Sequence, residues 1–197
     1  MILSNSEVLS AIDEGRLVID PQPHPRGHVE GQKCPYQTSA VDLRLGPELS
    51  IFKEKPSPVA IDLSDGGFAV FAGSATEQKT ITDDQPFRLK PGLFILGRTL
   101  EKVGLPIQKE ADRTLAARVE GKSSYARCGL LVHFTAPTIH AGFAGTIALE
   151  IINLGHYPIL LRPKMLICQL IVEEVRGVPF RNEGQFQNQA RPTGHSS

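Results

Sequence analysis

The feature that most constrains the fold is a long succession of short apolar runs, each ended by residues that favour turns. The runs are rich in Val, Ile, Leu, Phe and Thr, which pack well on a pleated sheet. Turn signals such as Asp65-Gly66-Gly67, Lys90-Pro91-Gly92 and Arg162-Pro163 separate them. Strands are therefore expected over residues 17–19, 41–45, 49–52, 59–63, 67–71, 79–82, 93–100, 115–120, 130–135, 145–153, 159–161 and 166–173. So many short strands with only one or two helices predict an all-β barrel or sandwich.

The N-terminal region adds a helix and a loop to this plan. Ser4 and Glu7 form a capping-box pattern before an apolar run, and Gly15 offers a stop. This pattern predicts a short helix over residues 5–14. Residues 21–38 contain four prolines and are expected to form an irregular loop.

The strand that follows this loop alternates strictly between apolar and charged residues. Val41, Leu43 and Leu45 should therefore face one way, and Asp42 and Arg44 the other.

Composition limits the function classes. The 197 residues carry a formal net charge of zero, so no overall field attracts the chain to nucleic acid or to a membrane surface. No apolar run reaches 18 residues, and the first residues lack the cationic region of a secretory signal. Cys34, Cys128 and Cys168 are odd in number and widely spaced, which suits reduced thiols better than a disulfide framework. We therefore expect a single cytoplasmic domain that binds neither nucleic acid nor membrane.

The segment between Gly121 and Gly129 has the components of an anion site. The two glycines leave room for only about two turns of helix. Ser123 and Ser124 would lie in its first turn, where free backbone N–H groups attract an anion, and Lys122 adds a cation. Arg127 would share a face with Ser123, since the two residues are four apart.

An ordinary surface turn is the alternative interpretation of the same residues. The segment is not a P-loop, because the Walker pattern needs glycine where Ala116 stands.

One carboxylate interrupts the apolar strand that ends near Asn153. By the two-residue period of a strand, Glu150 shares its face with Ala148 and Ile152. An ionised carboxylate buried there without a partner would be costly. It should therefore line a wet pocket, pair with a cation or carry a raised pKa. The alternative is a rim carboxylate on a half-exposed strand.

The run GKSSYARCGLLVHFTAPTIHAGFAGTIALEIIN, from Gly121 to Asn153, resembles the dCTP deaminases of the trimeric dUTPase superfamily. Those enzymes show G-[RK]-S-S-x-A-R-x-G-L, then T-A and I-D-x-G-[FWY]-x-G, then a strand with the catalytic glutamate. The resemblance extends to residues 39–46, to residues 161–165 and to the polar tail. It implies one domain over residues 1–197 with a β-clip fold, a distorted jelly-roll-like barrel of the dUTPase type. It also implies a homotrimer with intersubunit active sites.

The resemblance implies hydrolytic deamination of dCTP to dUTP and ammonia, with Glu150 as general base and then general acid. Ser123 and Arg127 would stabilise charge that develops on the pyrimidine, and the backbone near Ala136 would help hold the attacking water. Lys122 and Ser124 would hold the phosphates, with Mg²⁺ bridging phosphate oxygens. The other residues implied to bind substrate are Tyr125, Ala126, His140, Ala148, Leu149, Phe180, Gln185 and Gln189.

The tail over residues 177–197 is polar and is interpreted as a lid that closes over the nucleotide, with a frayed terminus as the alternative. Phe186 and Gln189 match the aromatic residue and the glutamine of the family tail. At Gln185 the family often has lysine, and at Phe180 it has tyrosine, so a phosphate contact and a hydroxyl are lost.

No zinc site is expected. His28, Glu30 and Cys34-Pro35 resemble the H-x-E…P-C-x-x-C signature of zinc deaminases, but Cys34 precedes its proline and Gln37 stands where the second cysteine should be.

His140 replaces the family aspartate of I-D-x-G, whose acceptor pair an imidazole cannot fully reproduce. A dUTPase or a bifunctional dCTP deaminase–dUTPase is therefore the second hypothesis. A nucleotide-binding relative without catalytic activity is the third.

Overall fold

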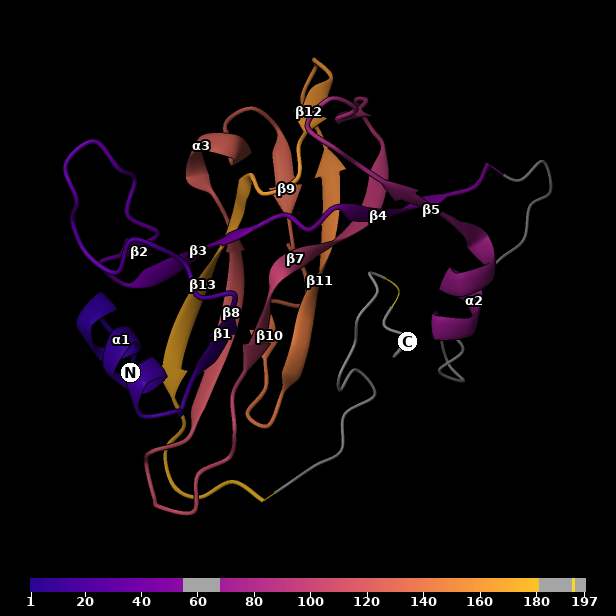
Figure 1. Cartoon of the computed structure of the whole chain (residues 1–197). Coiled ribbons are helices and arrows are strands. Elements are labelled where there is room, and N and C mark those ends of the chain that lie inside the picture. Colours follow the sequence, from indigo (N-terminus) through magenta and orange to yellow (C-terminus); the bar gives the residue numbers. More distant parts are fainter. Residues whose placement is uncertain (55–67, 181–192, 194–197) are drawn as a thin grey trace.

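The computed structural model describes residues 1–54, 68–180 and 193. Antiparallel strands dominate this part of the chain, and Figure 1 shows α1 and α2 on opposite sides of the long strands with α3 near one end. The first sheet has the order β5-β4-β7-β11-β9, and β1 pairs with the last residues of β7. Its strands are β1 (Val18–Asp20), β4 (Glu48–Phe52), β5 (Thr76–Thr80), β7 (Phe94–Gly104), β9 (Leu130–Val132) and β11 (Ala144–Asn153).

The second sheet has the order β10-β8-β13-β3-β2, and a separate two-stranded sheet pairs β12 with β6. The strands of these sheets are β2 (Tyr36–Gln37), β3 (Ala40–Arg44), β6 (Phe87–Leu89), β8 (Leu115–Gly121), β10 (Thr138–Ile139), β12 (Ile159–Leu161) and β13 (Leu166–Glu174). Apolar side chains of all three sheets form one buried cluster. The predicted all-β fold is confirmed.

The alternation predicted for β3 is also confirmed. Val41, Leu43 and Leu45 are fully buried in the apolar cluster. The opposite face is not left to solvent, because Asp42 is buried as well and Arg44 is half-buried. Each of these two charged residues has an ion-pair partner.

Two strand predictions need correction. Residues 68–71, expected as part of a strand, belong to the helix α2 (Phe68–Ala75). A short apolar run has no period that separates strand from helix, and three alanines in this one favour the helix. The strand expected over residues 79–82 lies earlier, at β5. The strand expected over residues 59–63 lies outside the described residues.

The first helix, α1 (Asn5–Asp13), agrees with the predicted capping pattern. Ser4 is the N-cap, and its Oγ accepts a hydrogen bond from the backbone N–H of Glu7 at 3.3 Å. After the helix, Gly15 adopts a left-handed φ of 70°. None of the helices in the described residues has the length and apolarity to cross a bilayer.

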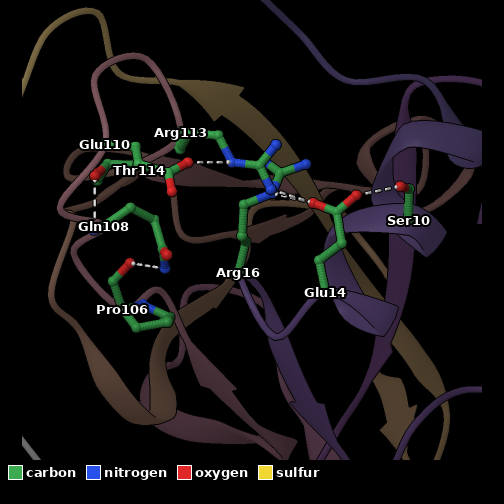
Figure 2. A network of polar contacts seen from close by, with 8 residues as sticks. All are labelled: Ser10, Glu14, Arg16, Pro106, Gln108, Glu110, Arg113 and Thr114. Atoms are coloured by element: carbon green, nitrogen blue, oxygen red, sulfur yellow. Dashed lines mark hydrogen bonds and ion pairs between the residues drawn. The ribbon is translucent and has the colours of Figure 1, made fainter.

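A polar network ties the end of α1 to the loop before β8 (Figure 2). Glu14 Oε2 lies 2.7 Å from Arg16 Nε and 2.6 Å from Arg113 Nη2, and Glu14 Oε1 accepts a hydrogen bond from Ser10 Oγ at 2.9 Å. The hydrogen bond from Arg16, helped by Ser10 and Arg113, lowers the pKa of Glu14 to about 2. The network therefore requires an ionised Glu14.

Candidate active site

The predicted helix between the two glycines is present as α3 (Ser123–Ala126), a single turn that starts directly after β8. Gly129 ends it with a φ of 87°, and a Cβ there would lie 2.2 Å from the backbone nitrogen of Gly155. Gly155 is equally restricted, because its Cβ would meet the carbonyl oxygen of Cys128 at 2.4 Å. The two glycines therefore let α3 sit directly against the turn after β11.

Lys122, the N-cap residue of α3, has its ammonium group inside the protein. Nζ contacts Oδ1 of Asp42, and the two side chains are 11% and 0% exposed. Asp42 also accepts hydrogen bonds from Gln169 Nε2 at 3.1 Å and from Gln37 Nε2 at 3.3 Å. The ion pair anchors the start of α3 to β3. The phosphate contact of Lys122 stays a prediction.

The serines and the arginine of this segment are exposed. Ser123, Ser124 and Arg127 are all solvent-accessible, and within the part of the chain that the structure describes no hydrogen bond or ion pair involves their side chains. Tyr125 is half-buried against the apolar cluster, while Ala126 is exposed. The polar groups of α3 are thus available to a ligand or to a second chain.

Glu150 lies in the middle of β11, between β7 and β9. Its side chain is 29% exposed, and Oε2 lies 3.0 Å from Nδ1 of His133, whose side chain is 7% exposed. The N–H of His133 also donates to the backbone oxygen of Glu150 at 2.8 Å. Burial raises the pKa of Glu150, but the contact with His133 and a backbone hydrogen bond together lower it more, so the net direction is downward. Of the three predicted environments, the structure favours the one with a basic partner, His133, which is a cation when its imidazole is protonated.

Sequence reasoning missed His133. The only signal was one polar residue inside the apolar run Leu-Leu-Val-His-Phe. Its contact with Glu150 depends on the register of β9 against β11, in which Val132 pairs with Ile151. A single sequence does not display that register.

Within one chain, α3 and Glu150 lie at different positions along β11. The backbone oxygen of Gly129 accepts from the N–H of Leu154 at 2.8 Å, so the end of α3 lies beside Leu154. Glu150 is four residues further back, about 13 Å at roughly 3.3 Å per strand residue. Among the described residues, no hydrogen bond or ion pair joins α3 to Glu150.

The remaining predicted site residues are scattered around this strand. Ala148 is half-buried, and Leu149 points into the core, so only its backbone could contact a base. Ala136 and His140 are exposed on the segment that leads into β11. Phe180 is 89% exposed at the end of the described chain. Gln185, Phe186, Gln189 and most of the predicted lid over residues 177–197 lie outside the described residues.

The zinc-like segment has a different local structure. Cys34 Sγ donates to the backbone oxygen of Pro25 at 3.5 Å. Across the described ranges, the structure contains no cluster of three or more His, Cys, Asp or Glu side chains arranged to bind a metal. The absence of zinc from the protein stays a prediction.

Fold and site together define a β-rich protein in which a one-turn Ser-Ser helix precedes a strand with a carboxylate on its half-buried face. The family model described as dCTP deaminase-like matches residues 2–175, and the chain belongs to this family.

Proteins with similar sequences carry related names. The chain is 38% identical over 195 residues to the "dCTP deaminase, dUMP-forming" of Methanosphaera stadtmanae, covering 99% of this chain and 90% of that one. It is 34% identical over 202 residues to the "dCTP deaminase" of a Marinomonas species, covering 98% and 96%.

Among solved structures, the chain resembles the 2'-deoxycytidine 5'-triphosphate deaminase of Agrobacterium tumefaciens, with a TM-score of 0.59 and 19% identity. The match covers 90% of this chain and 48% of that chain, so this chain spans about half its length. This similarity supports the β-clip, jelly-roll-like fold of the dUTPase type, which is confirmed.

Proposed function

We propose that this protein is a dCTP deaminase that hydrolyses dCTP to dUTP and ammonia, with Glu150 as general base and then general acid. The observation that carries the proposal is the partly buried Glu150, which lies 3.0 Å from His133 on an apolar strand of a dCTP deaminase-like chain. Relatives named dCTP deaminase that align over nearly the whole chain support the substrate.

The proposed reaction begins with addition of water to C4 of the cytosine. Glu150 takes one proton of the water, and this proton passes to the ring nitrogen. Glu150 then takes the proton of the new hydroxyl group on C4 and transfers it to the amino nitrogen. The bond between C4 and this nitrogen breaks, C4 becomes a carbonyl carbon, and ammonia leaves. Because Glu150 has a lowered pKa, it is ionised at neutral pH and ready to accept the first proton. One water enters and one ammonia leaves, so Glu150 returns to its initial state.

The exposed residues of α3 supply the substrate contacts in this proposal. Ser123 and Arg127 donate to the pyrimidine as negative charge develops on it, and Ser124 with the first amides of α3 binds phosphate oxygens. Mg²⁺ bound with the triphosphate would neutralise part of the phosphate charge beside these residues. The backbone near Ala136 helps hold the water.

The proposed assembly is a homotrimer whose active sites combine residues of two subunits. The support is geometric: Ser123 and Arg127 lack partners among the described residues, and α3 lies about 13 Å along β11 from Glu150 at the rise of a strand. A neighbour's Glu150 could therefore be the one that these residues serve.

The product is the point on which the relatives differ. The relatives from Methanosphaera stadtmanae and Dictyoglomus thermophilum are named dUMP-forming, which favours a bifunctional enzyme as the second candidate. His140, in place of an acidic acceptor pair, favours dUTP. Incubation with dCTP and Mg²⁺, followed by quantification of ammonia, dUTP and dUMP, tests both. We expect ammonia and dUTP in equal amounts. Ammonia with dUMP and pyrophosphate would establish the bifunctional enzyme, and binding without ammonia a non-catalytic relative.

A further inference from the structure

His133 has an unusual conformation at the point where β9 ends. It follows Val132 directly and has a φ of 54°, in the left-handed region that few residues other than glycine adopt. This turn places the imidazole under the protein surface, where its Nδ1 lies 3.0 Å from Glu150 Oε2. The backbone N–H of the same residue binds the backbone oxygen of Glu150. His133 therefore holds both the main chain and the side chain of Glu150.

The side-chain contact is short but not well aligned. Nδ1 and Nε2 of His133 and Oε2 of Glu150 are all buried, and none of them has a hydrogen bond of good geometry among the described residues. When the imidazole is protonated, it attracts the carboxylate at this 3.0 Å distance even so, because Coulomb energy depends on distance more than on angle. Oε2 is thus shielded from solvent, and its close polar neighbour in the described chain is His133.

The other elements packed around Glu150 contribute no comparable charge. On β7, Leu96 lies opposite Glu150, and the next residue on the same side, Arg98, pairs with Glu48. On β9, the residue on the face of Glu150 is the apolar Leu131, which lies opposite Ile152. Among the described residues, His133 is the titratable group that acts on this carboxylate.

We propose that His133 is a positioning residue for catalysis: its imidazole fixes Oε2 of Glu150 and leaves Oε1 to receive the proton of the water. This inference rests on the proposed deaminase function and adds to it the residue that prepares the base.

A purely structural role explains His133 less well. A strand that must end in a left-handed residue does so most easily with glycine or asparagine. An imidazole in that position carries the strain of its φ and, in addition, buries ring nitrogens without well-aligned partners. Such features persist where the side chain has a function, and the close contact with Glu150 indicates which function it is.

The effect of His133 on the pKa of Glu150 has a definite direction. Burial raises the pKa of Glu150, and His133 and a backbone hydrogen bond lower it, so removal of the imidazole leaves burial opposed by the backbone hydrogen bond alone. The carboxylate would then be protonated over a wider range of acidic pH, in which it cannot accept a proton from water. The acid limb of the rate profile should move to higher pH.

Two variants of His133 and one control test the proposal. His133→Gly removes the ring and accepts the left-handed φ without strain, so the strand end should be retained. His133→Asn also tolerates this φ and keeps an N–H donor close to the position of Nδ1, but without a charge. His24→Asn, at an exposed histidine in the loop before β2, controls for loss of an imidazole elsewhere.

The first readout is independent of activity. Carbon-13 NMR titration of glutamate-labelled protein without nucleotide, with the Glu150 signal assigned by its loss in Glu150→Gln, measures the pKa of this carboxyl group. We expect H133G to raise it by roughly one unit or more, as loss of a nearby favourable partner typically does. H133N should give a smaller rise, and H24N none.

The second readout is the pH dependence of kcat and KM for dCTP. The acid limb of kcat should shift in H133G by as much as the NMR titration shifts, with KM changed by no more than about threefold because the pyrimidine contacts are untouched. H133N should shift the acid limb of kcat less than H133G does.

An unchanged Glu150 titration in H133G would overturn the proposal, and so would a shifted titration with a wild-type rate profile. Wild-type protein that releases no ammonia from dCTP would refute the proposed function, while the NMR titration would still judge the coupling of His133 to Glu150.

Discussion

Replacement of Lys122 by methionine tests whether the buried ion pair with Asp42 holds the start of α3. Methionine keeps much of the length of the side chain but removes its charge, so the fully buried Asp42 carboxylate retains only the two neutral amide donors of Gln37 and Gln169. Breaking a buried pair by removal of one partner typically costs about 3–5 kcal/mol. At roughly 2–4 °C per kcal/mol for a chain of this size, Tm should fall by about 6–20 °C.

The matched control is the double variant Asp42→Asn with Lys122→Met. It removes both charges, and an asparagine can still accept from Gln169 while Gln37 reorients its amide. Most of the lost stability should return in thermal and urea unfolding. K122M with a Tm within about 2 °C of wild type would refute a structural ion pair, since this is less than the smallest expected fall. A stable double variant that fails to bind dCTP would instead favour the phosphate contact predicted for Lys122.

Three other predictions follow from the charged groups. The network with Arg16 and Arg113 lowers the pKa of Glu14 to about 2, so the ionised Glu14 stabilises the fold fully above the ordinary pKa range of a glutamate, and this stability is lost as pH falls through that range towards 2. Glu14→Gln should therefore reduce the fall of Tm at acid pH. Identical dependence of Tm on pH in the two proteins would contradict this prediction. Ser123→Ala and Arg127→Ala should each lower kcat roughly 10²–10³-fold with an unchanged Tm, because both residues are exposed; near-normal kcat in either variant would remove that residue from the catalytic proposal. After stringent metal removal, Mg²⁺ should restore deamination; restoration by Zn²⁺ alone would contradict the zinc-free mechanism.

Local patterns predicted much of the fold. The alternation around Val41 and the glycines that bound α3 determine structure within a few residues, and both predictions agree with the structure. The run after Gly67 was assigned wrongly, because five or six apolar residues fit a strand and a helix equally well.

The contacts that tune the site could not be predicted in this way. Asp42 and Lys122 are 80 residues apart in the sequence, and their pairing depends on how β3, β13 and the end of β8 align. The approach of His133 to Glu150 depends on the register between β9 and β11 and on one left-handed residue. Glu150 itself was detectable, because a carboxylate on an apolar strand requires a reason.

The most direct measurement of the central claim uses Glu150→Gln, which keeps the size of the side chain but supplies no base at any accessible pH. The measurement combines kcat for ammonia release from dCTP with nucleotide affinity and Tm on the same variant. If Glu150 activates the water, the variant binds dCTP and melts as wild type does, while kcat falls by at least the roughly 10²–10⁴-fold typical of general-base loss. A rim carboxylate would leave turnover within a few fold, and a structural partner would lose stability and binding together. Full turnover with an unchanged Tm would contradict the proposed mechanism.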